Sequence, residues 1–259
     1  MPDRIRLDGR VAVVTGAAGV IGTATIRLLA ERGARIVAVD RREDDLKAAI
    51  TDLPASAQAL PVAADVTSED EVAGYVRAAI DKFGTIDVFY NNAGVEGDIK
   101  PITQYPLAAF RKVIDVNVVG VFLGLKHVLP VMLKQNKGSV INTASIAGLI
   151  GSPDIAVYSA SKHAVIGLTK SAALECAGTD VRVNCVCPGL IDSRMLSSII
   201  QGRNPGNAPV PNDRIVERIP ARRLGQASEV ASIVAFLASD DASYVSGSAH
   251  TVDGARTAG

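Results

Sequence analysis

The chain has no excess of charge of either sign. Its 259 residues include 27 Lys or Arg and 27 Asp or Glu, so its formal net charge is zero. Proteins that bind nucleic acids or anionic membranes through charge present a basic surface. The composition therefore gives no reason to expect nucleic acid or a membrane as a partner, and a small molecule is the expected ligand.

Cysteine is scarce, and the three that occur form no C-x-x-C pair. Cys185 and Cys187 lie two residues apart in an apolar run, which predicts that both occupy one face of a buried strand. Reduced core thiols in a cytoplasmic protein are the expected state. His127, His163 and His250 lack ligand spacing, so no metal site is expected.

Long apolar runs are also missing. No run reaches the roughly 18 residues of a membrane-spanning helix. The charged segment from Met1 to Gly9 lacks the apolar core of a secretory signal, so we expect no leader. No linker or low-complexity segment divides the chain, and its length suits one α/β domain over residues 1–259.

Short β-branched runs alternate with helical patterns along the chain. The helical patterns lie near residues 21–32, 43–52, 68–83, 107–136 and 154–178. The strand-like runs are Val11–Val14, Arg35–Val39, Ala59–Val62, Ile86–Phe89, Ser139–Asn142 and Val181–Val186. Apolar strands of this kind suit a parallel sheet covered on both faces. The repeated βαβ order predicts a single-domain, Rossmann-like α/β fold, a doubly wound parallel sheet with helices on both faces.

One segment differs from the rest in composition. Ser197–Asp213 is rich in Gly, Pro, Asn and Ser and lies between two helical patterns. It is longer than a routine connection between elements. We expect a mobile lid near residues 192–215 or, alternatively, an inserted surface loop.

Tyr158 and Lys162 lie four residues apart, which places them on one face of a helix. A free tyrosine has a pKa near 10, and a nearby positive charge favours the phenolate. Tyr158 could therefore exchange a proton with a carbonyl or alcohol oxygen. Exposed helix pairs show the same Y-x-x-x-K spacing, so other segments must decide between the two interpretations.

The first expected strand leads into a glycine-rich turn, Thr15–Gly22, and then into a helix. Glycine permits a tight turn and lets backbone amides approach a pyrophosphate at the helix N-terminus. Because the turn follows the first strand of a βαβ unit directly, it predicts a dinucleotide-binding site.

Asp40 ends the second expected strand, eighteen residues after Gly22. An acidic residue there accepts a hydrogen bond from the adenosine ribose 2′-hydroxyl. It would also repel a 2′-phosphate, at a cost of about 4 kcal/mol for charges about 4 Å apart in an effective dielectric of about 20. Arg41 and Arg42 could pair with such a phosphate, but no basic residue in the turn assists them. NAD is therefore favoured over NADP.

Together these segments resemble the short-chain dehydrogenase/reductase family over essentially the whole chain. The matching segments, in order, are Thr15–Gly22, Asp65–Val66, Asn91–Gly94, Asn117–Gly120, Ser145, Tyr158 with Lys162, and Pro188–Gly189. The segments Asn91–Gly97 and Gly120–Leu125 also resemble the levodione reductase branch of secondary-alcohol dehydrogenases. One position departs from the family pattern: Val20 replaces the usual second glycine, and Gly19 precedes it. The Val20 side chain is expected to point away from the pyrophosphate.

The resemblance implies a role for each catalytic residue. Tyr158 would be the base in alcohol oxidation and the acid in ketone reduction. Lys162 would lower the pKa of Tyr158 and hold the nicotinamide ribose hydroxyls. Ser145 would hydrogen-bond the substrate oxygen and stabilise its developing charge. Asn117, at a bend in its helix, would hold a water molecule in a proton relay.

The resemblance also implies a set of cofactor contacts. Asp65 and Val66 would flank the adenine, and Ile191 would bond the nicotinamide carboxamide through its backbone. The full expected set is Gly16, Gly19, Ile21, Asp40, Asp65, Val66, Asn92, Ala93, Gly94, Tyr158, Lys162, Pro188, Gly189, Ile191 and Ser193.

The expected substrate pocket is largely apolar. Its predicted contacts are Glu96, Ala147, Ile155, Leu190 and Met195. Glu96 could meet a second substrate oxygen, although an exposed residue at the rim is the favoured interpretation. A cyclic or short secondary alcohol and its ketone suit this lining better than a phosphorylated or highly acidic substrate.

These features predict an NAD-dependent oxidoreductase that transfers hydride between a secondary alcohol and its ketone. One alternative is a 3-oxoacyl thioester reductase of the same fold, which Asp40 disfavours because such reductases usually take NADPH. The other is a catalytically silent nucleotide-binding protein, and the complete set of Asn117, Ser145, Tyr158 and Lys162 argues against it.

The resemblance further implies a homotetramer. Helices containing residues 107–136 and 154–178 would pack against a second subunit, and the C-terminal segment would join another interface. The apolar side chains that could serve either the core or this contact are Val113, Val116, Val121, Leu125, Ala164, Leu168 and Ala172.

Overall fold

The computed structural model describes residues 5–204, 206 and 212–259, and it contains a seven-stranded parallel sheet. The strand order is β3-β2-β1-β4-β5-β6-β7, so the winding direction reverses between β1 and β4. The strands are β1 Val11–Thr15, β2 Arg35–Asp40, β3 Ala59–Ala63, β4 Val88–Asn91, β5 Gly138–Thr143, β6 Val181–Pro188 and β7 Ala249–Val252. The doubly wound parallel fold predicted from the sequence is confirmed.

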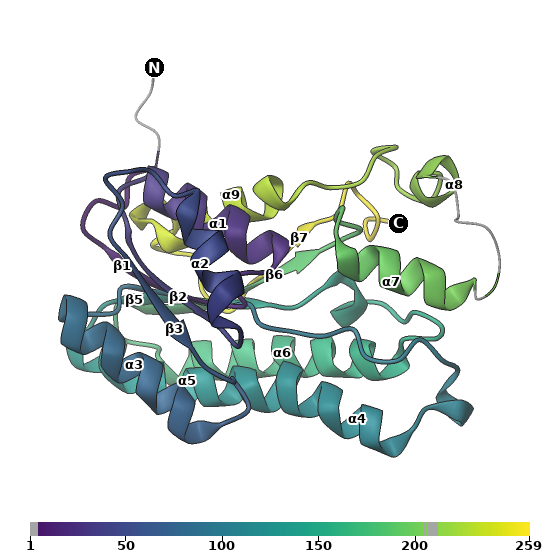
Figure 1. The fold of residues 1–259 in the computed structure, drawn as a ribbon, viewed down its shortest axis with the longest axis horizontal. Helices are drawn as coiled ribbons and strands as arrows, with labels where there is room; N and C mark the ends of the chain where they lie inside the picture. The colour runs from purple at the N-terminus through teal and green to yellow at the C-terminus, as the bar shows by residue number, and fades with distance from the viewer. Residues whose placement is uncertain (1–4, 205, 207–211) are drawn as a thin grey trace.

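Helices cover both faces of the sheet (Figure 1). One layer contains α1 Val20–Glu31, α2 Glu43–Thr51 and α9 Ala227–Ala238, and the other contains α3 Glu69–Phe83, α4 Leu107–Ile114, α5 Gly120–Gln135 and α6 Ala156–Glu175. Each layer encloses its own apolar core against the sheet. Two further helices, α7 Arg194–Arg203 and α8 Asn212–Val216, lie with the C-terminus at the right-hand end in Figure 1.

One strand and three α-helices were absent from the sequence-based expectation: β7, α7, α8 and α9. β7 has four residues, all at least partly exposed, and it offers no apolar run. Its strand character comes from pairing with β6, where Cys185 lies opposite Ala249. The fourth strand also begins two residues later than expected, at Val88 instead of Ile86.

The long helical pattern at 107–136 is two helices joined by a π-helical turn, Asp115–Val119. Among the described residues, Leu107–Gln135 is the one helical stretch long and apolar enough to cross a membrane, although the sequence pattern suggested none. The structure buries 44% of the apolar window of this stretch. Much of its apolar surface therefore packs inside the protein as a core helix does.

The expected loop at Ser197–Asp213 is wrong in its first part, because α7 continues to Arg203. The Ser193 hydroxyl caps this helix by accepting from the Leu196 N–H at 3.3 Å. Leu196, Ile199 and Ile200 follow helical spacing on one face. The glycine and proline content of the whole segment obscured this short periodic stretch. Residues 205 and 207–211 of the expected lid lie outside the described part of the chain.

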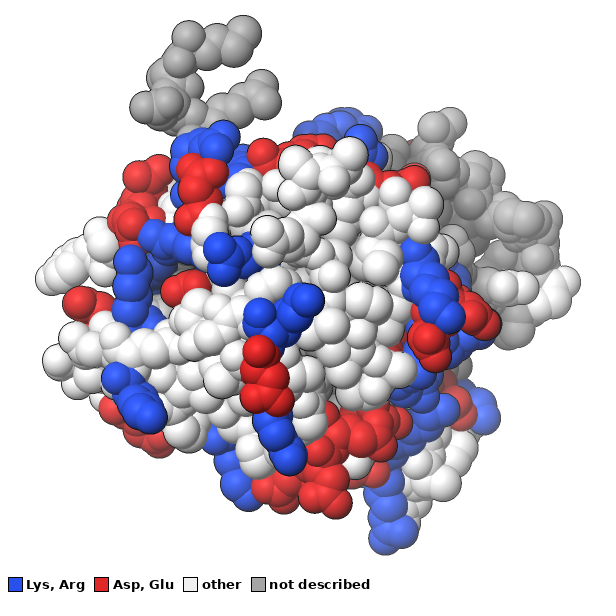
Figure 2. Space-filling model, turned by 60° about the vertical axis from the view of Figure 1, so that its left-hand side comes forward, with Lys and Arg blue, Asp and Glu red and all other residues white. Residues whose placement is uncertain are grey.

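The three cysteines are buried and free, as predicted. The surface carries both signs of charge. On the face in Figure 2, Lys and Arg are interspersed with Asp and Glu, between broad uncharged areas. This pattern agrees with the balanced composition of the chain.

Candidate active site

The strands β1, β4, β5 and β6 end at the same edge of the sheet, where the winding reverses. Ligands of open α/β sheets bind in the crevice at this point. A cavity of about 730 Å³ opens there and brings Ser145, Tyr158 and Lys162 together. The expected cofactor contacts that line it are Ile21, Asn92, Gly94, Tyr158, Lys162, Pro188, Gly189, Ile191 and Ser193. The expected adenosine-end contacts, Gly16, Gly19, Asp40, Asp65, Val66 and Ala93, do not line it.

The glycine-rich turn is closely packed on one side and open on the other. Gly16 has a φ of +64°, and a Cβ there would lie 2.9 Å from the Cα of Ala93. A Cβ on Gly22 would lie 2.0 Å from the carbonyl oxygen of Gly16, so both glycines are needed to form the turn. At Gly19, the N-cap of α1, a Cβ would meet only the Gly16 oxygen at 3.3 Å. The helix N-terminus is therefore open to a phosphate, as a dinucleotide requires.

Val20 is the first residue of α1, and 48% of it is exposed. The substitution of valine for the usual glycine thus leaves the turn and the helix start intact. Its expected orientation away from a pyrophosphate remains a prediction.

Thr15 and Thr143 hold the strand ends in register around Asn92. The Thr15 hydroxyl accepts from the N–H groups of Asn92 and Ala93, at 2.9 and 3.1 Å. The Asn92 amide donates to the carbonyl oxygens of Thr15 and Gly16, and its oxygen accepts from the Thr143 hydroxyl at 3.1 Å. The contacts of both threonines were not expected from the sequence, where their only signal was their position at the ends of strands.

Asp40 lies at the glycine-rich turn. One carboxylate oxygen accepts from the Ala18 N–H at 3.1 Å and the other from the Arg41 N–H at 2.8 Å. Arg42 forms an exposed ion pair with Asp45 at 3.2 Å, so it already has a partner in this structure.

Asp65 and Val66 have structural contacts in addition to their expected role. The Asp65 carboxylate accepts from the N–H and the hydroxyl of Thr67, at 2.9 and 2.8 Å. Val66 packs against Gly120, where a Cβ would lie 2.9 Å from the valine Cγ2. Gly120 therefore lets α5 approach the loop that would border the adenine.

Tyr158 and Lys162 lie on α6 and are buried, with 8% and 3% of each residue exposed. This burial excludes the alternative of an exposed helix pair. The Lys162 ammonium donates to the Thr143 carbonyl oxygen at 2.7 Å and lies 5.6 Å from the centroid of the Tyr158 ring.

The pKa of Tyr158 lies above its ordinary value. Burial raises this pKa to about 12, a hydrogen bond with Ser145 offsets part of the rise, and the negative charge of Glu96 adds to it. Burial also lowers the pKa of Lys162 to about 8. The loss of hydration at the buried phenol is the largest cause of the rise in the tyrosine pKa. The expected lowering of the tyrosine pKa by Lys162 stays a prediction.

Ser145 follows β5 and caps a short 3₁₀ turn by accepting from the Ala147 N–H at 3.2 Å. Its hydroxyl lies 3.5 Å from the carbonyl oxygen of Pro188, at the end of β6. These contacts fix the hydroxyl at the floor of the cavity beside Tyr158.

Asn117 is buried within the π-helical turn. Its side-chain oxygen accepts from the Val95 N–H at 2.8 Å, and its amide donates to the Val95 oxygen at 2.9 Å and to the Ser161 hydroxyl at 3.0 Å. The side chain thus ties the loop after β4 to the catalytic helix α6. The water of the expected relay would have to bind elsewhere on this turn.

Glu96 was expected at an exposed rim, and this expectation is wrong. Only 7% of the residue is exposed, and its carboxylate accepts from the Arg194 guanidinium at 3.1 Å. Arg194 starts α7 and supplies the counter-charge that permits burial. Since the partners are 98 residues apart in sequence, the pair could not be inferred from local pattern. Glu96 also does not line the cavity.

The backbone of Ile191 faces the cavity. Ile191 forms a parallel bridge with Gly225. The hydrogen bonds of this bridge involve the residues on either side of Ile191: the Gly225 N–H donates to the Leu190 oxygen, and the Asp192 N–H donates to the Gly225 oxygen. The N–H and C=O of Ile191 therefore point the other way, and its carbonyl accepts from the Ser193 hydroxyl at 3.1 Å. This geometry fits the expected backbone contact with a carboxamide.

The other predicted substrate contacts line the cavity: Ala147, Ile155, Leu190 and Met195. Ala147, Ile155 and Tyr158 form a small apolar cluster with Ile99, Met195 and Ile199. The sequence analysis did not include Ile199 and Ile200 of α7, nor four arginines that line the same cavity, Arg203, Arg214, Arg218 and Arg256.

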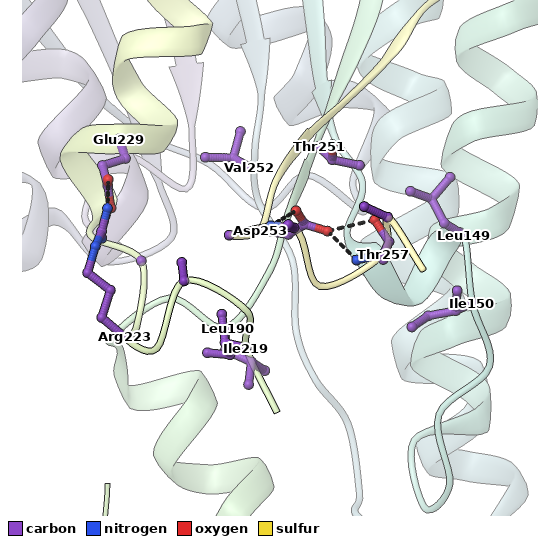
Figure 3. A pocket seen from close by; sticks show the side chains of 15 residues that line it. Leu149, Ile150, Leu190, Ile219, Arg223, Glu229, Thr251, Val252, Asp253 and Thr257 are labelled. Atoms are coloured by element: carbon purple, nitrogen blue, oxygen red, sulfur yellow. Dashed lines mark hydrogen bonds and ion pairs between the residues drawn. The ribbon is translucent and has the colours of Figure 1, made fainter. Parts of the chain in front are cut away.

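A second cavity, of about 800 Å³, shares Ile150 and Leu190 with the first. Its charged groups are already paired (Figure 3). Arg223 forms an ion pair with Glu229, and Asp253 accepts from the Thr257 N–H at 3.0 Å and from its hydroxyl. All three charged side chains of this cavity thus have hydrogen-bond partners, although the Asp253 carboxylate has only uncharged donors.

The fold and the catalytic cavity define an oxidoreductase that uses a nicotinamide dinucleotide. A family model described as enoyl-(acyl carrier protein) reductase matches residues 16–256. The chain belongs to the short-chain dehydrogenase/reductase family.

Several curated relatives match almost the whole chain. A levodione reductase from Leifsonia aquatica is 40% identical over 98% of this chain and 96% of its own length. A cis-4-hydroxycyclohexanecarboxylate dehydrogenase from Sinomonas cyclohexanicum is 43% identical over 96% and 97%. A 3-oxoacyl-[acyl-carrier-protein] reductase from Thermotoga maritima is 38% identical over 96% and 98%.

Solved structures show the same fold. The crystal structure of a levodione reductase superposes with a TM-score of 0.94, at 39% identity, over 98% of this chain and 99% of that one. An NAD⁺-bound xylitol dehydrogenase gives 0.92, at 38% identity, over 95% and 98%. An actinorhodin polyketide ketoreductase variant with NADPH gives 0.90, at 36% identity, over 95% and 97%. Neighbours of this fold thus use either cofactor.

Proposed function

We propose that this protein is an NAD-dependent dehydrogenase that interconverts a secondary alcohol and its ketone, with Tyr158 as the acid and base. The observation that carries the proposal is the buried arrangement of Ser145, Tyr158 and Lys162 at the switch point of the sheet. A catalytically silent relative would have no need to bury an ammonium and a phenol together.

The substrate oxygen lies between the hydroxyls of Ser145 and Tyr158. In ketone reduction the Tyr158 phenol donates its proton to this oxygen, and in alcohol oxidation the phenolate takes the proton back. Ser145 donates a hydrogen bond that stabilises negative charge on the oxygen. NAD, when bound, would supply the acceptor for the hydride of the carbinol carbon.

Lys162 positions the cofactor end of the site. Its ammonium is oriented by the Thr143 carbonyl oxygen and retains donors for the ribose hydroxyls. The N–H groups of the glycine-rich turn and the N-terminus of α1 would hold the pyrophosphate. The backbone of Ile191 would hold the carboxamide.

The preference for NAD rests on Asp40. Its carboxylate lies at the end of β2 against the glycine-rich turn, which suits a ribose 2′-hydroxyl and opposes a 2′-phosphate. The same feature disfavours the alternative of an NADPH-dependent 3-oxoacyl thioester reductase.

The substrate is a secondary alcohol with an apolar body, and a ring fits the cavity well. Ala147, Ile155, Leu190 and Met195 supply apolar walls around the reacting oxygen. The dehydrogenase and reductase relatives named for cyclic substrates support this class.

The helix α7 acts as the cover of this cavity. Met195, Leu196, Ile199 and Ile200 line it from this helix, which lies close to the cofactor contacts Ile191 and Ser193. Movement of α7 would admit substrate, and its return would exclude water.

The protein works in the cytoplasm as a homotetramer, independently of membranes and nucleic acids. Buried free thiols and the balanced charge support this setting. Val113, Val121, Leu125 and Ala172, which were open to either role, are buried in the monomer core. The tetramer contacts would instead come from the exposed apolar side chains of the same helices, Leu107, Phe110, Phe122, Leu133 and Leu174.

The decisive experiment is a panel of secondary alcohols assayed with NAD and with NADP at the NADH absorbance band. We expect oxidation of cyclohexanol and substituted cyclohexanols, with a higher kcat/KM for NAD. Acetoacetyl thioester reduction with NADPH serves as the comparison reaction. Activity confined to the thioester would contradict the proposal.

A further inference from the structure

The described lining of the catalytic cavity contains several positive charges and no acidic residue. Arg203, Arg214, Arg218 and Arg256 line it together with Lys162, and no Asp or Glu belongs to its described lining. The arginines come from α7, α8, the segment after α8 and the C-terminal segment, which meet at one end of the molecule (Figure 1). Four chain segments thus bring guanidinium groups to one space.

Arg203 is held in place by uncharged acceptors. Its guanidinium donates to the Ser152 hydroxyl at 2.8 Å and to the Pro153 carbonyl oxygen at 2.6 Å. Burial lowers the pKa of Arg203, the negative charge of Asp154 opposes this shift, and the positive charge of Arg218 adds to it with a smaller effect. Arg218 is therefore close enough to act on Arg203.

Arg214, Arg218 and Arg256 make no side-chain hydrogen bond or ion pair with another described residue. Some arginines elsewhere are paired with carboxylates, as Arg27 is with Glu31 and Arg223 is with Glu229 in the neighbouring cavity (Figure 3). Other exposed arginines, such as Arg77 and Arg111, make no such pair with a described residue. What distinguishes the four arginines is therefore that they line one cavity.

Arg203, Arg214 and Arg218 are exposed, so solvent screens their mutual repulsion, and a bound anion would reduce it further. The planar guanidinium fork matches carboxylate and sulfonate oxygens in a bidentate manner. Apolar side chains that include Ile155, Met195 and Ile199 line the same cavity and pack with Tyr158. The cavity therefore offers polar catalytic groups, apolar walls and cationic side chains.

We infer that the substrate carries a carboxylate or sulfonate at the end remote from its hydroxyl, and that these arginines bind it. This inference rests on the proposed function and specifies its substrate class: an alcohol with an apolar body and one anionic end. Apolar walls and a single anion are compatible, because the anion lies beyond the walls.

A rival occupant for the arginines is the pyrophosphate of the cofactor. The turn that would hold that group precedes α1, and Ile21 is the α1 residue that lines the cavity. The arginines belong to segments at and beyond the other end, near α7 and α8. Assignment to the cofactor would show as a change in the KM for NAD.

The test compares 4-hydroxycyclohexanecarboxylate with its methyl ester, and 4-hydroxycyclohexanesulfonate as a third substrate. For the wild type we expect kcat/KM for at least one of the two anions to exceed that for the ester by at least about 10-fold, the size expected for charge-assisted hydrogen bonds. Raising salt from about 0.01 M to about 1 M shortens the Debye length from about 30 to about 3 Å, so the KM for that anion should rise.

The variant for this test is the double substitution Arg214→Gln and Arg218→Gln, since neither side chain bonds another described residue. It should reduce kcat/KM for the preferred anion by at least about 10-fold more than for the ester. The matched control is Arg77→Gln, an exposed arginine on α3 across the sheet, which removes one positive charge far from the cavity. This control should leave kcat/KM unchanged for both the anion and the ester.

The remaining outcomes all speak against the inference. Equal or better use of the ester by the wild type, or equal losses for acid and ester in the double variant, would overturn it. A raised KM for NAD with the acid preference intact would assign the arginines to the cofactor. Failure to oxidise any alcohol in the panel would overturn the proposed function itself, whereas oxidation of the ester but neither anion would overturn this inference alone.

Discussion

At the scale of single residues, the proposed reaction depends on a proton held by Tyr158. Tyr158→Phe keeps the ring and its packing but removes this proton. We expect kcat for cyclohexanol oxidation to fall by at least about 10²-fold, the lower range for general acid–base catalysis, with NADH binding retained by fluorescence titration. Tyr244→Phe is the matched control, because Tyr244 is fully exposed. Near wild-type turnover in Tyr158→Phe would refute the mechanism.

The pH dependence follows from the raised pKa of Tyr158, about 12 in the free protein. The phenol is protonated at neutral pH, which suits ketone reduction, and alcohol oxidation requires the phenolate. The rate of oxidation should therefore rise with pH through the alkaline range. Glu96 contributes to the raised pKa, because a negative charge opposes ionisation of the phenol.

Glu96→Gln removes that negative charge and should lower the pKa of Tyr158. We expect the rising limb of kcat/KM for alcohol oxidation to move to lower pH, measured with a buffer series of constant ionic strength. The control Glu31→Gln breaks an exposed pair with Arg27 and should leave the limb in place. A limb that stays fixed in Glu96→Gln would mean that the carboxylate only anchors Arg194.

Asp40 determines cofactor choice in the proposed function. Asp40→Asn keeps one acceptor oxygen for the turn but removes the charge that repels a 2′-phosphate. The ratio of kcat/KM for NAD to that for NADP should fall by at least about 10-fold, within the about 4 kcal/mol that one such repulsion represents. Asp44→Asn, on the adjacent helix, is the control. A wild type that already prefers NADP would contradict this assignment.

The site residues that could be predicted from the sequence were those identified by the order of motifs along the chain and by the spacing of residues within each motif. Ser145, Tyr158 and Lys162 meet in the cavity as expected. The Glu96–Arg194 pair and the Thr15–Asn92–Thr143 contacts depend on partners far apart in the chain. Polar residues of this kind make these contacts only when the sheet brings the strand ends together. Local sequence patterns therefore do not predict them.

At the scale of elements, the strand-and-helix alternation could be predicted because each buried strand carries its own apolar run. β7 could not, because its pairing with β6, not its own composition, makes it a strand. α7 was hidden by the glycine- and proline-rich residues that follow it. Short elements thus depend on tertiary contacts more than on intrinsic preference.

The same helix gives a prediction about motion. α7 covers the cavity with Met195, Leu196 and Ile199, and it makes a side-chain contact with Glu96 through Arg194. We expect amide hydrogen exchange in residues 194–203 to slow when NADH and a ketone analogue bind together, because closure would reduce local opening. The helix α3 serves as an internal control within the same experiment. Unchanged exchange on binding would show that α7 is a fixed wall.

At the scale of the whole molecule, the two helical layers differ in what they leave at the surface. The layer with α4, α5 and α6 exposes large apolar side chains: Leu107, Phe110, Phe122, Leu133 and Leu174. Large exposed apolar side chains concentrated on one layer favour that layer as an interaction surface. The balanced net charge gives no long-range repulsion between copies.

These side chains lead to the last prediction, the homotetramer. Most soluble oligomers use two-fold interfaces in which the same patch meets itself, and paired helices α5 and α6 would bury this patch. Light scattering at micromolar concentration should give a mass about four times the 26.9 kDa of one chain. Phe122→Glu places a charge in the patch and should reduce the mass, whereas Phe122→Leu keeps an apolar contact and should not. A monomeric mass for the wild type would contradict the assembly and would leave the exposure of these apolar side chains unexplained.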